Sequence, residues 1–189
     1  MYNFKLKLNL GFNNFKHVVS KEELRPSLNG VNLNIKRKRI ECTDSYVLVC
    51  YPIHFEGESE IESCVLPLYV FDKKRYYSRH CLKNVTMDAF EFKVDLENNI
   101  VYVYFLKKEV YKGYLIEDKY PNCEAVLNVT KQEGIEEMYV SLSLLNNIRL
   151  ATKSKSNTIK FKTNGSNKAI TFKNEDGVFG LIMPSFDKY

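Results

Sequence analysis

Hydrophobic and polar residues alternate at the start of the chain and again at many later points. Every second residue from Tyr2 to Leu10 is hydrophobic, and the residues between are polar. This pattern is typical of a strand with one buried and one exposed face. Hydrophobic residues fill both faces of 46–51, which is typical of a central strand. Strands are also predicted at 31–35, 40–42, 61–66, 90–94, 100–106, 110–116, 138–142, 159–161, 170–172 and 178–183.

Helical spacing, with hydrophobic residues three and four positions apart, occurs in three other stretches. It predicts helices at about 12–22, 68–83 and 144–153. The resulting order is a strand, a helix and three strands, and this order occurs three times. We therefore expect an α+β fold built from three units, at 1–55, 61–128 and 129–189.

Composition narrows the class of protein only a little. The 189 residues carry 28 basic and 23 acidic side chains, and the net charge of +5 modestly favours an anionic partner. Five cysteines without a C-x-x-C pair indicate reduced, buried thiols. No apolar run reaches the roughly 20 residues of a membrane helix, and the N-terminus lacks a signal-peptide pattern. We expect a cytoplasmic protein with no membrane partner.

Candidate catalytic chemistry is sparse. The three histidines, His17, His54 and His80, are far apart and lack the spacing of metal ligands. The chain contains no G-x-S-x-G, no Walker loop and no G-x-G-x-x-G. We therefore expect no enzyme, no metal and no cofactor. A small-molecule-binding protein would need a deep pocket with converging polar groups, which the sequence does not show.

Four segments together resemble motifs of one family. Residues 24–31 (LRPSLNGV) resemble the RP-x-L-x-GV entry to a sheet in bacterial sliding clamps, the beta subunit of DNA polymerase III. Residues 42–48 (CTDSYVL) resemble the clamp segment A-T-D-x-x-R-L, and 117–122 (EDKYPN) resemble G-x-[FY]-P-D-Y. Residues 180–184 (GLIMP) resemble the closing V-V-M-P.

The resemblance implies a DNA-clamp-like fold, with helices on one side of antiparallel sheets. Residues 1–128 would match the clamp's middle domain, and about 138–189 the second half of its last domain. The chain departs from the family at Val47, where Arg is common, at Asn128, where Pro is common, and in the tail 185–189. By this match the chain would lack the clamp's first domain and half of its third. That difference puts the usual two-chain ring in doubt. An unpaired third unit leaves an exposed sheet edge, so we expect a homo-oligomer.

Duplex DNA is the first partner that the resemblance implies, held without sequence specificity by cations on the helices. The alternative is that these cations only solvate helix faces, as lysine and arginine commonly do. The basic segment 36–39 could likewise touch phosphate or simply form a solvated turn. The candidate DNA-binding residues are Lys16, Lys21, Arg25, Lys73, Lys74, Arg75, Arg79, Lys83, Arg149 and Lys153.

A hydrophobic peptide of a polymerase or another replication protein is the second implied partner. By resemblance its groove would be lined by Thr43, Tyr46, Leu48, Leu181 and Met183. The alternative for each residue is ordinary core packing. The chain would then be a non-enzymatic clamp-like protein that tethers a replication or repair partner to DNA. The alternative function is a clamp-fold interaction protein that mimics or blocks a clamp without encircling DNA.

Overall fold

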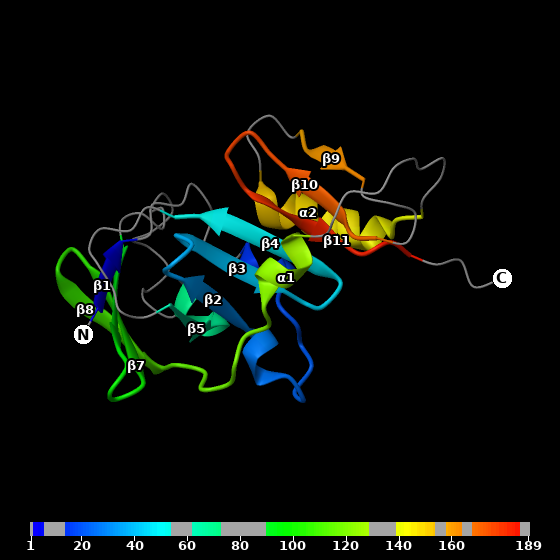
Figure 1. Cartoon of the computed structure of the whole chain (residues 1–189). Coiled ribbons are helices and arrows are strands. Elements are labelled where there is room, and N and C mark those ends of the chain that lie inside the picture. The colour runs from blue at the N-terminus through cyan, green and yellow to red at the C-terminus, as the bar shows by residue number, and fades with distance from the viewer. Residues whose placement is uncertain are drawn as a thin grey trace.

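Two antiparallel sheets form the framework of the molecule (Figure 1). The structure is a computed structural model that describes residues 2–5, 14–53, 62–72, 90–128, 139–153, 158–163 and 168–185. Within these residues the α+β class and the antiparallel sheets predicted from the sequence are confirmed.

The larger sheet has seven strands in the order β5-β2-β3-β4-β11-β10-β9. It joins strands of all three predicted units, because β11 of the third unit pairs with β4 of the first. Five of its strands, β2, β3, β4, β5 and β11, are buried along most of their length, and all of these except β5 are central. The strands are β2 (Gly30–Asn34), β3 (Arg39–Thr43), β4 (Val47–Pro52), β5 (Ser63–Pro67), β9 (Lys160–Lys162), β10 (Ile170–Lys173) and β11 (Phe179–Ile182).

The smaller sheet has the order β1-β6-β7-β8. Its strands show that the first two units exchange their first strands: β1 pairs with β6 of the second unit, and β5 pairs with β2 of the first. Neither sheet can therefore be completed by one unit alone. The strands are β1 (Tyr2–Lys5), β6 (Phe90–Asp95), β7 (Ile100–Phe105) and β8 (Lys108–Tyr114).

The helices are shorter than the sequence predicts, except the third. The helix α2 (Leu142–Thr152) agrees with the prediction. In the described part of the strand predicted just before it, only Tyr139 is paired, in a bridge to Ser185. In place of the first predicted helix, the described residues contain a 3-10 turn, η1 (Phe15–His17). Most of the second predicted helix lies outside the described residues, apart from the turn η3 (Leu68–Phe71). No described helix is long and apolar enough to cross a membrane.

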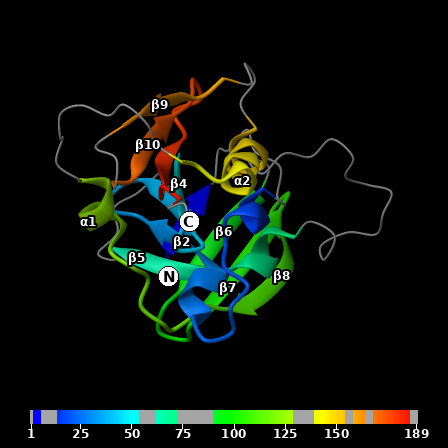
Figure 2. The same ribbon diagram turned by 90° about the vertical axis from the view of Figure 1, so that its right-hand side faces the viewer.

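Two further short helices were not predicted. One is a 3-10 turn, η2 (Pro26–Asn29), and the other is α1 (Cys123–Leu127), which starts at an Asn122 side chain that accepts a hydrogen bond from the Ala125 amide. Helices α1 and α2 lie on opposite faces of the larger sheet, as the two views show (Figures 1 and 2).

A row of aromatic rings joins the two sheets on the α2 side. The ring of Phe15 meets Tyr51 of β4 at 5.1 Å and Phe71 at 4.8 Å between centroids. Phe71 in turn lies 5.8 Å from Phe92 of β6. All four rings are buried, so their packing fixes η1 and η3 between the sheets.

The opposite, α1-side face of the sheet carries a buried ion pair. Arg39 was expected at an exposed hairpin tip, but its side chain is only 9% exposed, and its Nη2 lies 2.6 Å from Oε1 of Glu41. Glu41 also accepts a hydrogen bond from Asn32 at 2.7 Å, and Arg39 reaches Glu124 of α1 at 3.4 Å. A buried charge needs such partners, and here they tie α1 to the sheet.

The join between β4 and β11 depends on a glycine. Gly180 stands opposite Val49, and a Cβ at Gly180 would lie 1.8 Å from the carbonyl oxygen of Leu48. That oxygen is part of the backbone and cannot move aside without distorting the strand. A side chain at position 180 is therefore incompatible with this pairing.

We expect Gly180→Ala to lower the free energy of unfolding by about 1–3 kcal/mol or more, because the strands must separate locally. Chemical denaturation followed by circular dichroism measures this change. Gly113→Ala is the matched control: its Cβ would meet ring carbons of Tyr111 and Tyr69 at 3.0 and 3.1 Å, and these rings can shift. Equal losses in the two variants would contradict the importance of the β4–β11 join.

Candidate nucleic-acid and peptide interfaces

Basic side chains from two separate elements meet beside His17, on the α2 side of the larger sheet. Two side-chain donors, Asn14 Nδ2 and Tyr51 Oη, each lie 3.3 Å from the carbonyl oxygen of Ala151 in the last turn of α2. Carbonyls of a last helical turn have no partner inside the helix, so these bonds anchor the C-terminus of α2. Helix α2 then ends at Lys153, next to η1.

The pKa of His17 is lowered by its surroundings on this surface. Burial lowers this pKa most, and the positive charges of Lys16, Lys153 and Lys21 lower it further. All three lysine side chains are exposed, and none forms a salt bridge with a described residue. We call His17 with Lys16, Lys21 and Lys153 the lysine cluster. Its uncompensated positive charge suits an anion such as a phosphate.

The other candidate DNA-binding residues are placed differently. Arg149 is exposed on α2, one turn before Lys153, where Asn146 accepts a hydrogen bond from its guanidinium at 3.0 Å. Arg25 donates instead to Ser45 Oγ at 3.0 Å, in the turn between β3 and β4. The remaining candidates, Lys73, Lys74, Arg75, Arg79 and Lys83, lie outside the described residues.

The five candidate groove residues come together where β11 leaves β4. Leu48 pairs with Thr43 on one side and with Leu181 on the other. The ladder continues past the strands, because the Met183 amide donates to the carbonyl of Tyr46 at 2.9 Å. Two segments more than 130 positions apart in the chain therefore form one continuous surface.

The turn before β4 presents Tyr46 to solvent. Asp44 Oδ1 accepts hydrogen bonds from the amides of Tyr46 and Val47, at 2.9 and 2.8 Å. Ser45 has φ 81°, a conformation that is uncommon for residues other than glycine. This tightly bonded turn leaves the Tyr46 side chain 60% exposed.

The peptide surface, by which we mean Tyr46 and Met183 over Thr43, Leu48 and Leu181, has a buried floor. Leu48 and Leu181 are only 4% and 3% exposed, and Thr43 is buried as well. Of the five, only Tyr46 and the half-buried Met183 offer substantial area to a ligand.

Further residues, not predicted from the sequence, complete this floor. Leu28, Tyr120 and Cys123 belong to the same hydrophobic cluster as Leu48 and Leu181, and Leu127 of α1 packs against it. Tyr120 also donates a hydrogen bond to the backbone carbonyl of Glu41 at 3.3 Å. Leu28 and Tyr120 lie within two of the motifs that carry the family resemblance, which was the available signal.

The described cysteines act as small apolar side chains. Cys42, Cys50, Cys64 and Cys123 are buried with free thiols. Burial raises the pKa of Cys50 and of Cys64 to about 12, so both thiols stay protonated at neutral pH. In the described part of the chain, no three His, Cys, Asp or Glu side chains are grouped so that they could hold a metal ion.

Comparison with solved structures identifies the fold. The structure matches the beta clamp of Helicobacter pylori bound to a DNA ligase peptide with a TM-score of 0.69 at 14% sequence identity, over 98% of this chain and 66% of that chain. The DNA polymerase III beta subunit of Thermotoga maritima gives 0.70 at 13% identity, over 100% and 66% of the two chains. The DNA polymerase sliding clamp of Bacillus subtilis gives 0.68 at 14%, over 99% and 64%.

These matches show that the chain has the fold of bacterial sliding clamps. It spans about 66% of the length of the first two of these clamps. No family model matches the sequence, and no curated protein matches it either.

We expect Lys153→Met and Lys21→Met each to raise the pKa of His17 toward its ordinary value, because each removes a positive charge that opposes protonation. NMR titration of the His17 ring measures the change. Lys173→Met, which removes an exposed lysine of β10, is the control and should leave the pKa unchanged. An unchanged pKa in all three variants would show that the lysine cluster does not form.

Proposed function

We propose that the chain is a non-catalytic, clamp-like cytoplasmic protein that associates with duplex DNA and holds a partner by a hydrophobic peptide. The observation that carries the proposal is the joining of 43–48 to 181–183 through β4 and β11, within a sliding-clamp fold. This joining places an apolar surface beside β11 and a cationic surface beside α2.

The lysine cluster supports association with DNA. Its three lysines come from η1, the segment after it and the end of α2, all lower the pKa of His17, and form no salt bridge with described carboxylates. Contacts of this kind hold the phosphate backbone without reading bases. DNA binding that is electrostatic and independent of sequence is what a protein that moves along DNA requires.

The peptide surface supports the capture of a partner. Tyr46 provides an exposed aromatic ring with a polar tip, and Met183 provides a flexible apolar side chain that adapts to different ligands. Both rest on a packed floor that is already formed, so binding would cost little ordering. The Helicobacter pylori clamp, which has the same fold, was solved with a DNA ligase peptide.

Self-association completes the proposal. Strand β9 ends the larger sheet, and its three residues, including Phe161, are all exposed. An edge strand of this kind has unpaired backbone groups that another chain can pair with. We propose that copies of the chain join through such edges, with residues 1–128 as a clamp-like domain and 129–189 as a half-domain.

Duplex DNA should bind with an affinity that falls steeply with salt. Replacing Lys16, Lys21 and Lys153 together by Met should reduce the slope of log K against log salt concentration by about 0.9 for each phosphate that the lysines no longer neutralise. Fluorescence anisotropy of a labelled duplex, between about 25 and 200 mM salt, measures both the slope and the affinity.

The matched control removes the same charge from the other face of the sheet, by replacing Lys160, Lys162 and Lys173. These lysines alternate with Phe161 and Phe172, and Phe172 packs in the same cluster as Ile148 of α2. The control should keep the slope of the original protein. No binding of the unchanged protein at low salt would reject the DNA proposal and favour a clamp-fold protein that mimics or blocks a clamp.

A DNA ligase peptide of the kind bound by the Helicobacter pylori clamp should bind to the peptide surface. We expect Tyr46→Ala and Met183→Ala each to weaken this binding about tenfold, as truncation of an interface anchor does. Isothermal titration calorimetry measures the affinity. The control is Tyr114→Ala, which removes an exposed tyrosine from the smaller sheet. If all three variants bind equally well, the peptide surface is not the site.

A further inference from the structure

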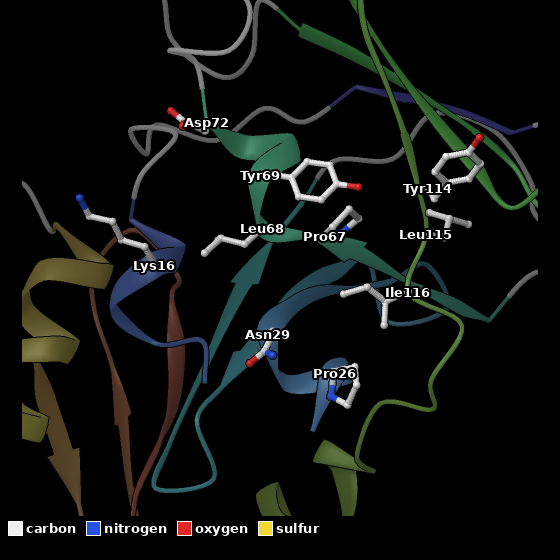
Figure 3. A pocket seen from close by; sticks show the side chains of 10 residues that line it. All are labelled: Lys16, Pro26, Asn29, Pro67, Leu68, Tyr69, Asp72, Tyr114, Leu115 and Ile116. Carbon is white, nitrogen blue, oxygen red and sulfur yellow. The ribbon is translucent and has the colours of Figure 1, made fainter. Parts of the chain in front are cut away.

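A cavity of about 670 Å³ lies between the two sheets, away from the peptide surface. Its walls come from η2, the end of β5 with η3, and the segment that follows β8 (Figure 3). Pro26 and Ile116 lie on one side, and Pro67 and Leu68 lie on another. The volume falls within the range of about 300–1,000 Å³ that is usual for small-molecule sites.

The cavity is separate from the peptide surface. None of its lining residues belongs to the set Thr43, Tyr46, Leu48, Leu181 and Met183. It shares Lys16 with the lysine cluster, and this lysine lies at the edge of the lining residues, on the side of Leu68 (Figure 3).

The walls are held in place by contacts of their own. The Ile116 amide donates to the carbonyl of Val65 at 3.0 Å, which ties the segment after β8 to β5. The ring of Tyr69 packs edge-on against Tyr111, with centroids 5.9 Å apart. Asn29 Nδ2 donates to the carbonyl of Glu22 at 3.0 Å, which fixes another part of the wall. A preformed site of this kind binds a ligand without first having to order its own residues.

Aromatic rings and aliphatic groups dominate the wall. Tyr69 and Tyr114 contribute rings on the side of the smaller sheet, and Leu68, Pro67 and Ile116 contribute aliphatic surface (Figure 3). A flat apolar body can contact both kinds of surface at once, because rings stack and aliphatic groups pack against them.

Lys16, in the cavity lining, favours a ligand that carries a negative group on its flat apolar body. Lys16 and Asp72 both line the cavity, and the exposed Lys16 side chain extends away from Leu68 and the other lining residues (Figure 3). Asp72 already takes part in another interaction, whereas Lys16 forms no salt bridge with a described residue. Lys21 and Lys153 also lower the pKa of His17, the residue next to Lys16, so further positive charge lies on the Lys16 side of the cavity.

We propose that this cavity binds a small-molecule carboxylate with a flat apolar body, the body lying between Leu68 and Ile116 and the carboxylate meeting Lys16. This is a ligand site in addition to the DNA and peptide surfaces. It supplies what a small-molecule-binding protein needs and what the sequence alone does not show, a pocket where apolar walls and a charged group converge.

Dansylglycine and dansylamide are matched probes for the site. Both carry the same flat apolar body, but only dansylglycine has a carboxylate. Their fluorescence rises on transfer to an apolar site and is excited well beyond the absorption of tyrosine and tryptophan. We expect dansylglycine to bind about threefold more tightly than dansylamide, as one exposed ion pair would give.

Three variants test the site against its alternatives. Lys16→Met should abolish the preference for dansylglycine, whereas Lys21→Met, which removes the same charge outside the cavity lining, should keep it. Leu68→Trp fills the cavity and should weaken both probes at least about tenfold, a loss of the size that excluded apolar contacts produce. Tyr114→Ala removes an exposed ring from the wall, leaves folding unaffected and should also weaken both probes.

The proposal fails if dansylglycine does not bind, if the two probes bind equally well, or if both Leu68→Trp and Tyr114→Ala bind them as the unchanged protein does. Binding of DNA by Leu68→Trp should match that of the unchanged protein, because Leu68 lies outside the lysine cluster. This measurement separates a failure of the ligand site from a failure of the DNA proposal.

Discussion

The pairing of β4 with β11 is the constraint on which both proposed macromolecular surfaces depend. It makes one seven-stranded sheet from strands that lie far apart in the chain. On one face it sets Met183 beside Tyr46, and on the other it brings α2 against η1. The backbones can approach only because position 180 is a glycine. A single ladder of hydrogen bonds thus positions two surfaces of different chemistry.

The two faces of the larger sheet differ in whether their positive side chains form ion pairs with described residues. Beside α1, Arg39 is buried and paired with Glu41 and Glu124, so its charge is neutralised within the protein. Beside α2, the exposed lysines around His17 have no such partner among the described residues. Charge that is left uncompensated on one face acts on the surroundings, whereas charge that is paired inside the other holds elements together.

Periodicity was enough to predict most of the described strands and the helix α2, because both depend on neighbouring residues. The exchange of β1 and β5 between sheets could not be predicted, since it is decided by packing across the domain. The same reason explains Arg39: the basic segment 36–39 looks like a solvated tip, and only the packing of α1, which brings Glu124 to Arg39, buries it beside Glu41. Motif resemblance singled out five residues that the structure brings together, and the burial of Thr43, Leu48 and Leu181 agrees with the alternative of core packing.

The exchanged strands also govern the order in which the protein can form during synthesis. Strand β1 leaves the ribosome well before its partner β6, which begins about 85 positions later, at Phe90. Until that point the first strand has an open edge in the nascent chain. Contacts between residues so far apart in sequence form slowly. Until they form, unpaired strand edges stay exposed and can associate with other chains. Along 3–9, lysine and asparagine alternate with hydrophobic residues in the sequence. Polar and charged residues of this kind disfavour pairing of an open strand with other chains.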